Sequence, residues 1–212
     1  DLDKTEANKA LVKGFIEGKI VRYSSIPSTD LSIRKLAAIE ALSRTGMAEP
    51  NLLGSITIEP NLWPTSALID WLNILLRMNG INARDAKLKE AEQIVRSRLN
   101  FQGTIMGFST EGMDNLWWLM VSADVNAERS VLTFLDFNSW KDDMPRLVKG
   151  ALGRQYRGAW NITTANAWGV LAMEKFSNKF ESVPVTGSTI AALDEKTRTI
   201  DWDKSVEGRS LM

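Results

Sequence analysis

The sequence contains no cysteine and no histidine. Without cysteine the chain has no disulfide framework, no thiolate nucleophile and no cysteine-ligated metal. Without histidine it lacks the most common metal ligand and the one side chain whose ordinary pKa suits proton transfer near neutral pH. A Ser-His-Asp or Cys-His catalytic arrangement is therefore excluded. We expect no metal and no cofactor in this chain.

A surplus of positive charge is also missing. Lysine and arginine together number 26, as do aspartate and glutamate, so the formal net charge is zero. Nucleic-acid binding requires cations that displace counterions from phosphates. We therefore expect no nucleic-acid partner.

Long apolar runs are absent as well, since none reaches the roughly 18 residues that a membrane-spanning helix requires. We expect no direct membrane insertion by this segment. The first residues, Asp1-Leu2-Asp3-Lys4, include no initiating methionine and no signal-peptide pattern. The expectation is a processed chain or a segment of a longer polypeptide.

What the sequence does contain is a series of helical patterns over residues 1–180. Apolar spacing and capping residues predict helices that begin near Asp3, Ser28 and Pro64, then helices over 84–99, 111–122, 126–137, 142–155 and 163–178. Residues 183–193 and 197–202 read instead as two strands joined across Asp194-Glu195-Lys196. A lone hairpin is marginally stable. We therefore expect a helical domain over 1–180, itself incomplete, and the start of a β-sandwich domain over 181–212.

An internal repeat is the most informative feature. Three segments each place an aromatic residue in a loop, then serine or threonine, then a helix with an early tryptophan. The aromatic and helix positions are Trp63 and Trp71, Phe108 and Trp117, and Trp160 and Trp168. The helix tryptophans are 46 and 51 residues apart, a period that suits two helices and two connections. Apolar and half-polar helices alternate, which indicates an inner and an outer layer. The prediction is an all-α fold, a partial α/α toroid of antiparallel helix hairpins; the alternative is an irregular helical bundle.

The eight tryptophans have two interpretations. They can fill wide gaps between helices, with the indole N–H bonded to a loop carbonyl, or they can stack on sugars or cations. Trp71, Trp117 and Trp168 lie in apolar stretches, which favours packing. Trp118 must point elsewhere than Trp117 and is the better surface candidate.

Polar residues near the helix starts also have a structural and a chemical interpretation. Asn115, Asn166 and the Thr163-Thr164 pair are typical of residues that bond a neighbouring loop or cap a helix. Three carboxylates, Asp70, Glu111 and Asp114, lie near the N-terminal ends of the marked helices, where negative charge is favourable. If they converged in a cleft, they would instead resemble the carboxylate pair of a glycosidase.

Residues 146–155 and 157–173 carry a family resemblance. The second stretch reads Arg157-Gly158-Ala159-Trp160-Asn161-Ile162-Thr163-Thr164-Ala165-Asn166-Ala167-Trp168, followed by a helix of small residues. It resembles the last helix hairpin of the thioester-type helical domain in the bacterial alpha-2-macroglobulin family. The likeness is strong over about residues 105–180, and the strands after residue 181 are similar to the start of the macroglobulin-like β-domain that follows in that family.

The resemblance implies a non-catalytic part of an endopeptidase inhibitor. Family members are large periplasmic or cell-envelope proteins, some membrane-anchored, with a terpenoid cyclase-like α/α toroid, that trap proteases after cleavage of a bait region. Many capture the protease through a Cys-x-Glu-Gln thioester, which this cysteine-free chain does not carry. The implied partners are neighbouring domains of the parent protein and target proteases. The alternative function is a toroid enzyme acting on carbohydrate or isoprenoid substrates.

Overall fold

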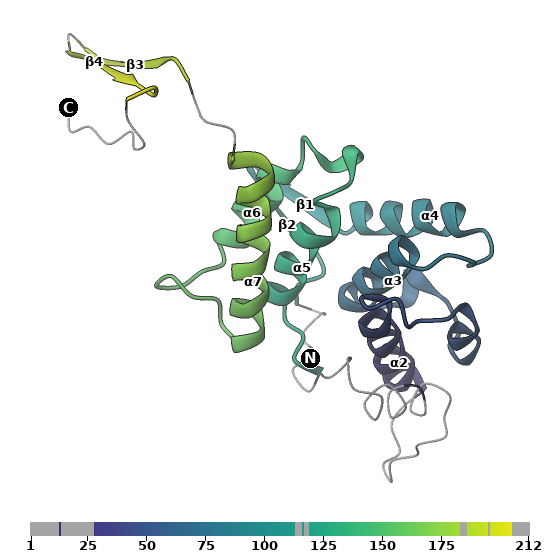
Figure 1. The fold of residues 1–212 in the computed structure, drawn as a ribbon. Coiled ribbons are helices and arrows are strands. Elements are labelled where there is room, and N and C mark those ends of the chain that lie inside the picture. The colour runs from purple at the N-terminus through teal and green to yellow at the C-terminus, as the bar shows by residue number, and fades with distance from the viewer. Residues whose placement is uncertain are drawn as a thin grey trace. The chain divides into compact units, whose positions relative to one another are not determined.

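The computed structural model describes residue 13 and residues 28–112, 116, 119–182, 186–194 and 196–204. These residues are mostly helical, with two small antiparallel β-hairpins (Figure 1). The α-helices are α2 (Ser28–Ser43), α3 (Thr65–Arg77), α4 (Arg84–Ser97), α5 (Ala123–Phe134), α6 (Met144–Leu152) and α7 (Thr163–Phe176). The hairpins are formed by β1 (Leu99–Gln102) with β2 (Ile105–Phe108), and by β3 (Ser188–Leu193) with β4 (Lys196–Asp201).

Shorter helical turns complete the described elements: η2 (Pro50–Ser55), η3 (Pro60–Leu62), η5 (Asn138–Trp140) and the π-helical turn η6 (Ser177–Glu181). None of the helices in the described ranges is both long and apolar enough to cross a membrane. The chain divides into two compact units, Asp1–Met173 and Glu174–Met212. The division falls inside α7, before the boundary at residue 180 that the sequence predicts.

Helix α3 is the centre of the first unit. Every residue from Thr65 to Leu75 is buried, and the helix packs against α2, α4 and α5 (Figure 1). A helix that is apolar around most of its circumference must be covered on all sides. This is the inner helix that the pattern after Pro64 predicts.

Helices α3 and α4 form an antiparallel pair, because each end of α4 bonds the opposite end of α3. Arg84, the first residue of α4, donates to the Leu76 carbonyl at 3.0 Å. Arg98, just after α4, donates to the Asn61 carbonyl before α3 at 3.1 Å. Only Ala91 and Val95 of α4 are buried. It is therefore an outer helix with one covered stripe.

Helices α5 and α6 form a second antiparallel pair. Arg154, two residues after α6, donates from Nε to Asp124 near the start of α5 at 2.6 Å. The link between the two helices is short and contains η5, whose Trp140 is fully buried against Phe134.

Three helices of different pairs run in the same direction. Arg77 at the end of α3 donates to Glu40 near the end of α2 at 2.6 Å. Asn73 of α3 donates to Thr133 of α5 at 3.0 Å, and Asp70 of α3 pairs with Arg129 of α5. Each contact joins residues at similar distances from their helix starts. Helix α3 therefore lies beside α2 and α5 and runs in the same direction as both, while α4 and α6 run the opposite way.

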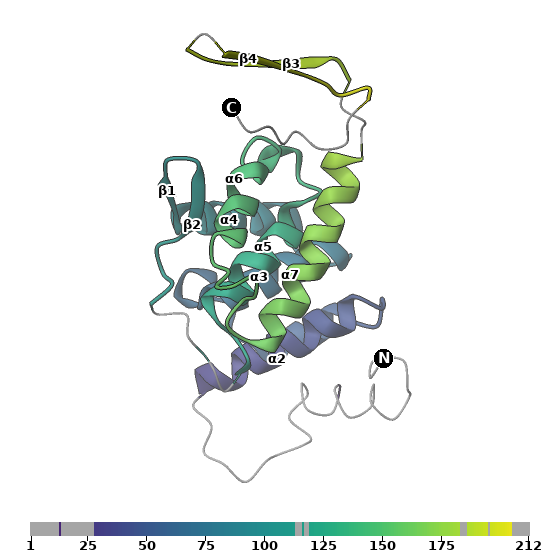
Figure 2. The same cartoon turned by 90° about the vertical axis from the view of Figure 1, so that its left-hand side faces the viewer.

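The first hairpin lies beside α6 (Figure 2). A Cβ placed on Gly150 of α6 would lie 2.0 Å from the Met106 carbonyl oxygen of β2, so only glycine permits this approach. The turn between the strands includes Gly103, with φ of +60°. In the second unit, β3 and β4 pair from Ser188 with Asp201 to Leu193 with Lys196.

The sequence predictions of individual elements have mixed outcomes. The helices near Ser28 and Pro64, those over 84–99, 142–155 and 163–178, and the C-terminal strand pair are confirmed within a few residues. The helix expected over 126–137 begins three residues earlier, where Ser122 accepts the capping bond from the Val125 amide at 3.2 Å.

One predicted helix is wrong, and one hairpin was not predicted. The described residues of 111–122 (111, 112, 116 and 119–122) contain no α-helix. The hairpin of β1 and β2 precedes this segment, and its four-residue strands are too short for alternation to distinguish them from a loop. The helix expected from Asp3 lies outside the described residues, apart from residue 13.

Candidate functional site

The loop before α7 is fixed to the helix by Asn166. Its side-chain Oδ1 accepts from the Trp160 amide at 3.1 Å, and its Nδ2 donates to the carbonyls of Trp160 and Ile162 at 2.8 and 2.9 Å. The Trp160 indole N–H donates to the Ala151 carbonyl of α6 at 2.9 Å. These bonds give partners to backbone groups of the loop that precedes the helix. Asn166 is thus placed as a structural residue.

The Trp160 ring lies directly on the backbone of α7. A Cβ at Gly169 would lie 2.3 Å from Trp160 Cζ3. Trp160, Val125 and Ala165 form a buried cluster, and Trp168 packs against it. Of the two threonines singled out in the sequence, Thr163 is exposed and Thr164 donates to the Met120 carbonyl at 3.4 Å.

The first repeat places its aromatics differently. Trp63 and Trp71 are both buried and meet edge to face, with ring centroids 6.2 Å apart. The Trp71 indole nitrogen has no hydrogen-bond partner, so the loop bond made by Trp160 does not recur there. In the second repeat Phe108 is buried. Trp117 lies outside the described residues, as do Asp114, Asn115 and Trp118.

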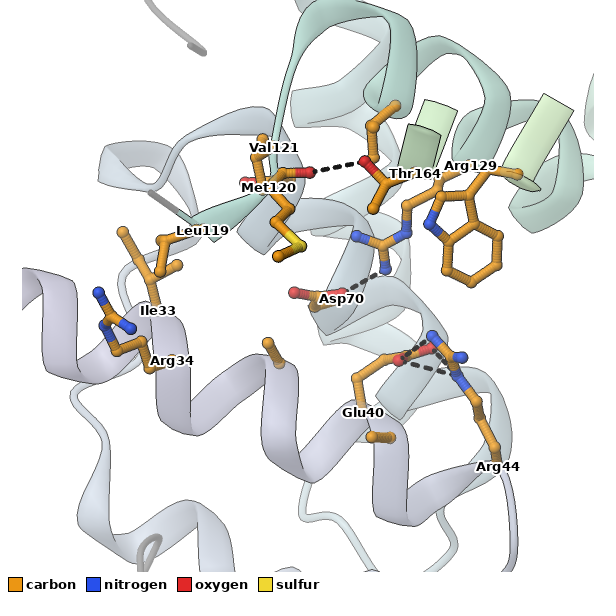
Figure 3. Close-up of a pocket in the computed structure, with 15 residues that line it drawn as sticks. Ile33, Arg34, Glu40, Arg44, Asp70, Leu119, Met120, Val121, Arg129 and Thr164 are labelled. Carbon is orange, nitrogen blue, oxygen red and sulfur yellow. Dashed lines mark hydrogen bonds and ion pairs between the residues drawn. The ribbon is translucent and has the colours of Figure 1, made fainter. Parts of the chain in front are cut away.

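Trp168 is only half-buried, unlike Trp71, and it lines a pocket of about 370 Å³. The pocket opens between α2, α3, α5, α7 and residues 119–121 (Figure 3). The guanidinium carbons of Arg44 and Arg129 lie 5.1 and 5.4 Å from the Trp168 ring centroid, within cation–π range. The tryptophan expected to be interior packing is therefore partly a wall of this pocket.

Charged residues form one end of the pocket. Glu40 is buried and accepts three hydrogen bonds from Arg44, at 3.1 Å to Oε1 and at 3.0 and 2.6 Å to Oε2, and one from Arg77 at 2.6 Å. Burial acts to raise the pKa of Glu40, but the hydrogen bonds and charges of Arg44, Arg129 and Arg77 outweigh burial and hold that pKa below its ordinary value. Glu40 is therefore a firmly ionised carboxylate.

Asp70 and Arg129 form the second ion pair of the pocket, and both are almost fully buried (Figure 3). Burial raises the pKa of Asp70, and the negative charge of Glu40 adds to the increase, against the opposing charge of Arg129. The pKa of Arg129 is raised by Asp70 and Glu40 although burial lowers it. Arg129 therefore stays charged, while Asp70 ionises less readily than an exposed aspartate.

The three carboxylates proposed as a catalytic set do not converge in the described structure. Asp70 lines the pocket just described, whereas Glu111 pairs with Arg154 and lines a separate cavity of about 290 Å³ beside the first hairpin. Asp114 lies outside the described residues. The carboxylate that shares the pocket with Asp70 is Glu40, which the sequence analysis did not single out.

Several buried polar atoms have no hydrogen-bond partner within the part of the chain that the structure describes. They are Ser66 Oγ, Trp71 Nε1, both side-chain amide atoms of Asn126 and both carboxyl oxygens of Glu128. Burial and the nearby Asp124 charge raise the pKa of Glu128 to about 8, with Arg154 opposing them. Glu128 is thus protonated at neutral pH. No group of three or more Asp or Glu residues in the described ranges could hold a metal ion.

Sequence reasoning missed the arginines that organise the pocket, Arg44, Arg77 and Arg129. A usable signal existed for Arg129, which follows Glu128 in the middle of a helix and precedes five apolar or small residues, 130–134. Charged residues are rarely buried unless paired. The partners of Arg77 and Arg129 have no sequence signal, since Glu40 and Asp70 lie on other helices, whereas Arg44 bonds Glu40 four residues before it, a spacing that the sequence itself shows.

Comparison of the chain with protein-family models, curated proteins and solved structures found no match.

Proposed function

We propose that this chain is a non-catalytic part of a bacterial alpha-2-macroglobulin-like protein that traps proteases in the cell envelope. In this proposal residues 1–180 form part of an α/α toroid and residues 181–212 begin a macroglobulin-like β-domain. The parent's neighbouring domains are the direct partners of the segment, and proteases are the targets of the parent.

The observation that carries the proposal is the clamp of Asn166 on the loop of Trp160. The family-like stretch of residues 157–173 is short, yet its distinctive residues have matching structural roles. Asn166 bonds the loop three times, and Gly169 makes room for the Trp160 ring. Because Trp160, Asn166 and Gly169 depend on one another structurally, their joint presence supports the resemblance to the family better than three unrelated matching residues would.

The directions of the helices give further support. Codirectional α3 and α5, each followed by a helix that runs the opposite way, match two successive hairpins of an α/α toroid, whereas α2 is separated from α3 by 3-10 turns and not by a returning helix. In a toroid each inner helix is followed by an outer one, so inner helices run the same way. An irregular bundle carries no such requirement.

Such a segment would act as a rigid body between moving domains. A protease trap rearranges after cleavage of its bait region, and the rearrangement changes which domain surfaces are in contact. The densely packed α3 would let the helical domain move as a unit, so that interface bonds change while its interior does not.

The test uses the full-length protein that contains this segment. The protein carrying Asn166→Ala is compared with the unchanged protein and with Asn51→Ala, an exposed asparagine whose only bond is a long one to Glu49. Each is incubated with an excess of chymotrypsin, and the protease retained after gel filtration is measured. We expect lower retention for Asn166→Ala alone. Retention unchanged by replacement of the whole segment with a flexible linker would disprove the role.

The alternative, a toroid enzyme for carbohydrate or isoprenoid substrates, is favoured by one observation. Glu40 and Asp70 line one pocket and have pKa values shifted in opposite directions, as an acid–base pair requires. Against it, both Glu40 oxygens are held by arginines. If the chain is an enzyme, the unchanged protein should turn over a carbohydrate or isoprenoid substrate. The Asp70→Asn variant should then show no turnover of that substrate.

A further inference from the structure

We propose that the pocket between α2, α3, α5 and α7 binds a carboxylate carried on a short apolar body. The proposal is independent of the protease-trapping role, because it concerns only the residues that line this pocket. Three features of the pocket support it: unused hydrogen-bond donors, an excess of positive charge and an apolar wall opposite them.

The donors come first from Arg129. Its side chain is almost fully buried, yet within the described part of the chain only its Nη2 donates a hydrogen bond, to Asp70. A guanidinium has five N–H groups, so most of the donors of Arg129 have no protein acceptor. None of the Arg129 nitrogens is among the solvent-inaccessible atoms without a partner, so these donors face the open pocket, where a ligand oxygen would accept from them in place of solvent. Figure 3 shows the guanidinium reaching from α5 into the pocket towards Asp70.

Ser66 adds a second unused group. It lines the same pocket, and its Oγ, which is closed off from solvent, has no hydrogen-bond partner among the described residues. A hydroxyl can donate to a carboxylate oxygen, whereas a guanidinium can bond the other oxygen. Ser66 and Arg129 come from α3 and α5, which are adjacent, so the two donors approach the pocket from neighbouring helices.

The charges at this end do not balance. Arg44 and Arg129 line the pocket with Glu40 and Asp70, and Arg77 bonds Glu40 from outside the lining, so these five residues leave one positive charge in excess. A ligand anion would neutralise the excess, whereas a ligand cation would add to it. The charge count therefore selects an anion.

The opposite end of the pocket is mostly apolar, with one arginine, Arg34, beside Ile33 (Figure 3). Ile33, Leu119, Met120 and Val121 line it, and Figure 3 places Ile33 and Leu119 away from the Arg129 guanidinium. A fully hydrated anion such as sulfate would make no favourable contact with these apolar side chains. A carboxylate with a hydrocarbon body uses both ends, and the volume of about 370 Å³ lies at the small end of the range for ligand sites.

The experiment is a calorimetric and NMR titration of the 212-residue chain with 3-phenylpropionate and, in parallel, with 3-phenylpropionamide. The amide has the same shape without the charge. We expect saturable binding of the acid and at least about tenfold weaker binding of the amide, the effect of losing a charge-assisted hydrogen bond. Equal binding of the two compounds, or no binding of the acid at about 10 mM, would overturn the proposal.

The variants are chosen to keep the fold intact. Arg129→Gln would leave Asp70 unpaired in the interior, so Arg44→Gln is the informative change, because its side chain is partly exposed. The matched control is Arg96→Gln. Arg96 is exposed to a similar extent, bonds Asp143 at 3.0 Å and lies over the Trp140 ring, but it is outside the pocket. We expect Arg44→Gln to weaken binding of the acid about tenfold and Arg96→Gln to leave it unchanged. Equal weakening by both variants would overturn the assignment to this pocket.

A second titration identifies the source of the carboxylate. A free small acid and the C-terminal carboxylate of a peptide share the same chemistry. N-acetyl-alanyl-phenylalanine with a free carboxylate is compared with 3-phenylpropionate. Tighter binding of the peptide assigns the site to a chain terminus, and tighter binding of 3-phenylpropionate assigns it to a small free acid.

Discussion

The Trp160 ring occupies the space in which a side chain at Gly169 would begin. A Cβ built on Gly169 lies 2.3, 2.5 and 2.7 Å from three atoms of that ring. Tryptophan and glycine are thus a matched pair across the loop-to-helix junction of α7.

Gly169→Ala should therefore destabilise the protein although alanine favours helix formation. The ring is rigid and bonded to the Ala151 carbonyl, so it cannot yield to the methyl group without losing that bond. We expect a loss of about 2 kcal/mol in the free energy of unfolding, measured by urea denaturation. Gly54→Ala is the control, because nothing lies within 4 Å of its added Cβ. A stabilised Gly169→Ala variant would contradict the packing.

Asn166→Ala should also destabilise the junction. It removes three hydrogen bonds and leaves the backbone groups of Trp160 without partners. We expect a loss of about 2–3 kcal/mol, read from thermal and urea unfolding. Asn166→Asp should be no better, because a carboxylate cannot donate to the Trp160 and Ile162 carbonyls. Full stability of the aspartate variant would mean that the donated bonds contribute little.

Arg129→Met should leave the Asp70 carboxylate buried without its partner. Breaking a buried ion pair from one side costs about 3–5 kcal/mol. The double variant Asp70→Leu with Arg129→Met removes both charges and should recover most of that loss. Since burial raises the pKa of Asp70, the single variant should lose less stability at acidic pH, where Asp70 is protonated. Urea unfolding at several pH values separates these outcomes; a double variant no more stable than the single one would contradict them.

Glu128 should make the protein less stable as the pH rises. Its pKa is about 8 in the folded chain and near the ordinary value of 4.5 in the unfolded chain. The folded state therefore keeps a proton that the unfolded state has released. The stabilising contribution is complete below about pH 4.5 and is lost as the pH rises to about 8, at up to about 1.4 kcal/mol per pH unit.

Glu128→Gln isolates this effect, since glutamine has the shape of the protonated acid and does not titrate. We expect the variant and the unchanged protein to have similar free energies of unfolding at pH 4.5, and the variant to be the more stable one at pH 9. Parallel pH profiles for the two proteins would show that Glu128 does not titrate in this range.

Much of the fold was predictable where the evidence lies within one helix. The apolar residues after Pro64 are spaced so closely around the helix that α3 had to be an interior element, and all of Thr65–Leu75 is buried. The segment after Gly112 was misread because its apolar residues are compatible with a helix that the described residues do not form. The hairpin at Gly103 was missed because four-residue strands carry too little alternation.

By itself, the sequence determined the helical character of the chain and excluded thiol and imidazole chemistry, because both follow from residue identity and local spacing. Only the tertiary structure decided which charges meet. Arg77 reaches Glu40 across 37 residues, and Arg129 reaches Asp70 across 59. Such pairings depend on which helices are adjacent and on the direction in which they run, and no local pattern encodes either. The pocket exists for the same reason, since its walls come from four helices brought together by packing.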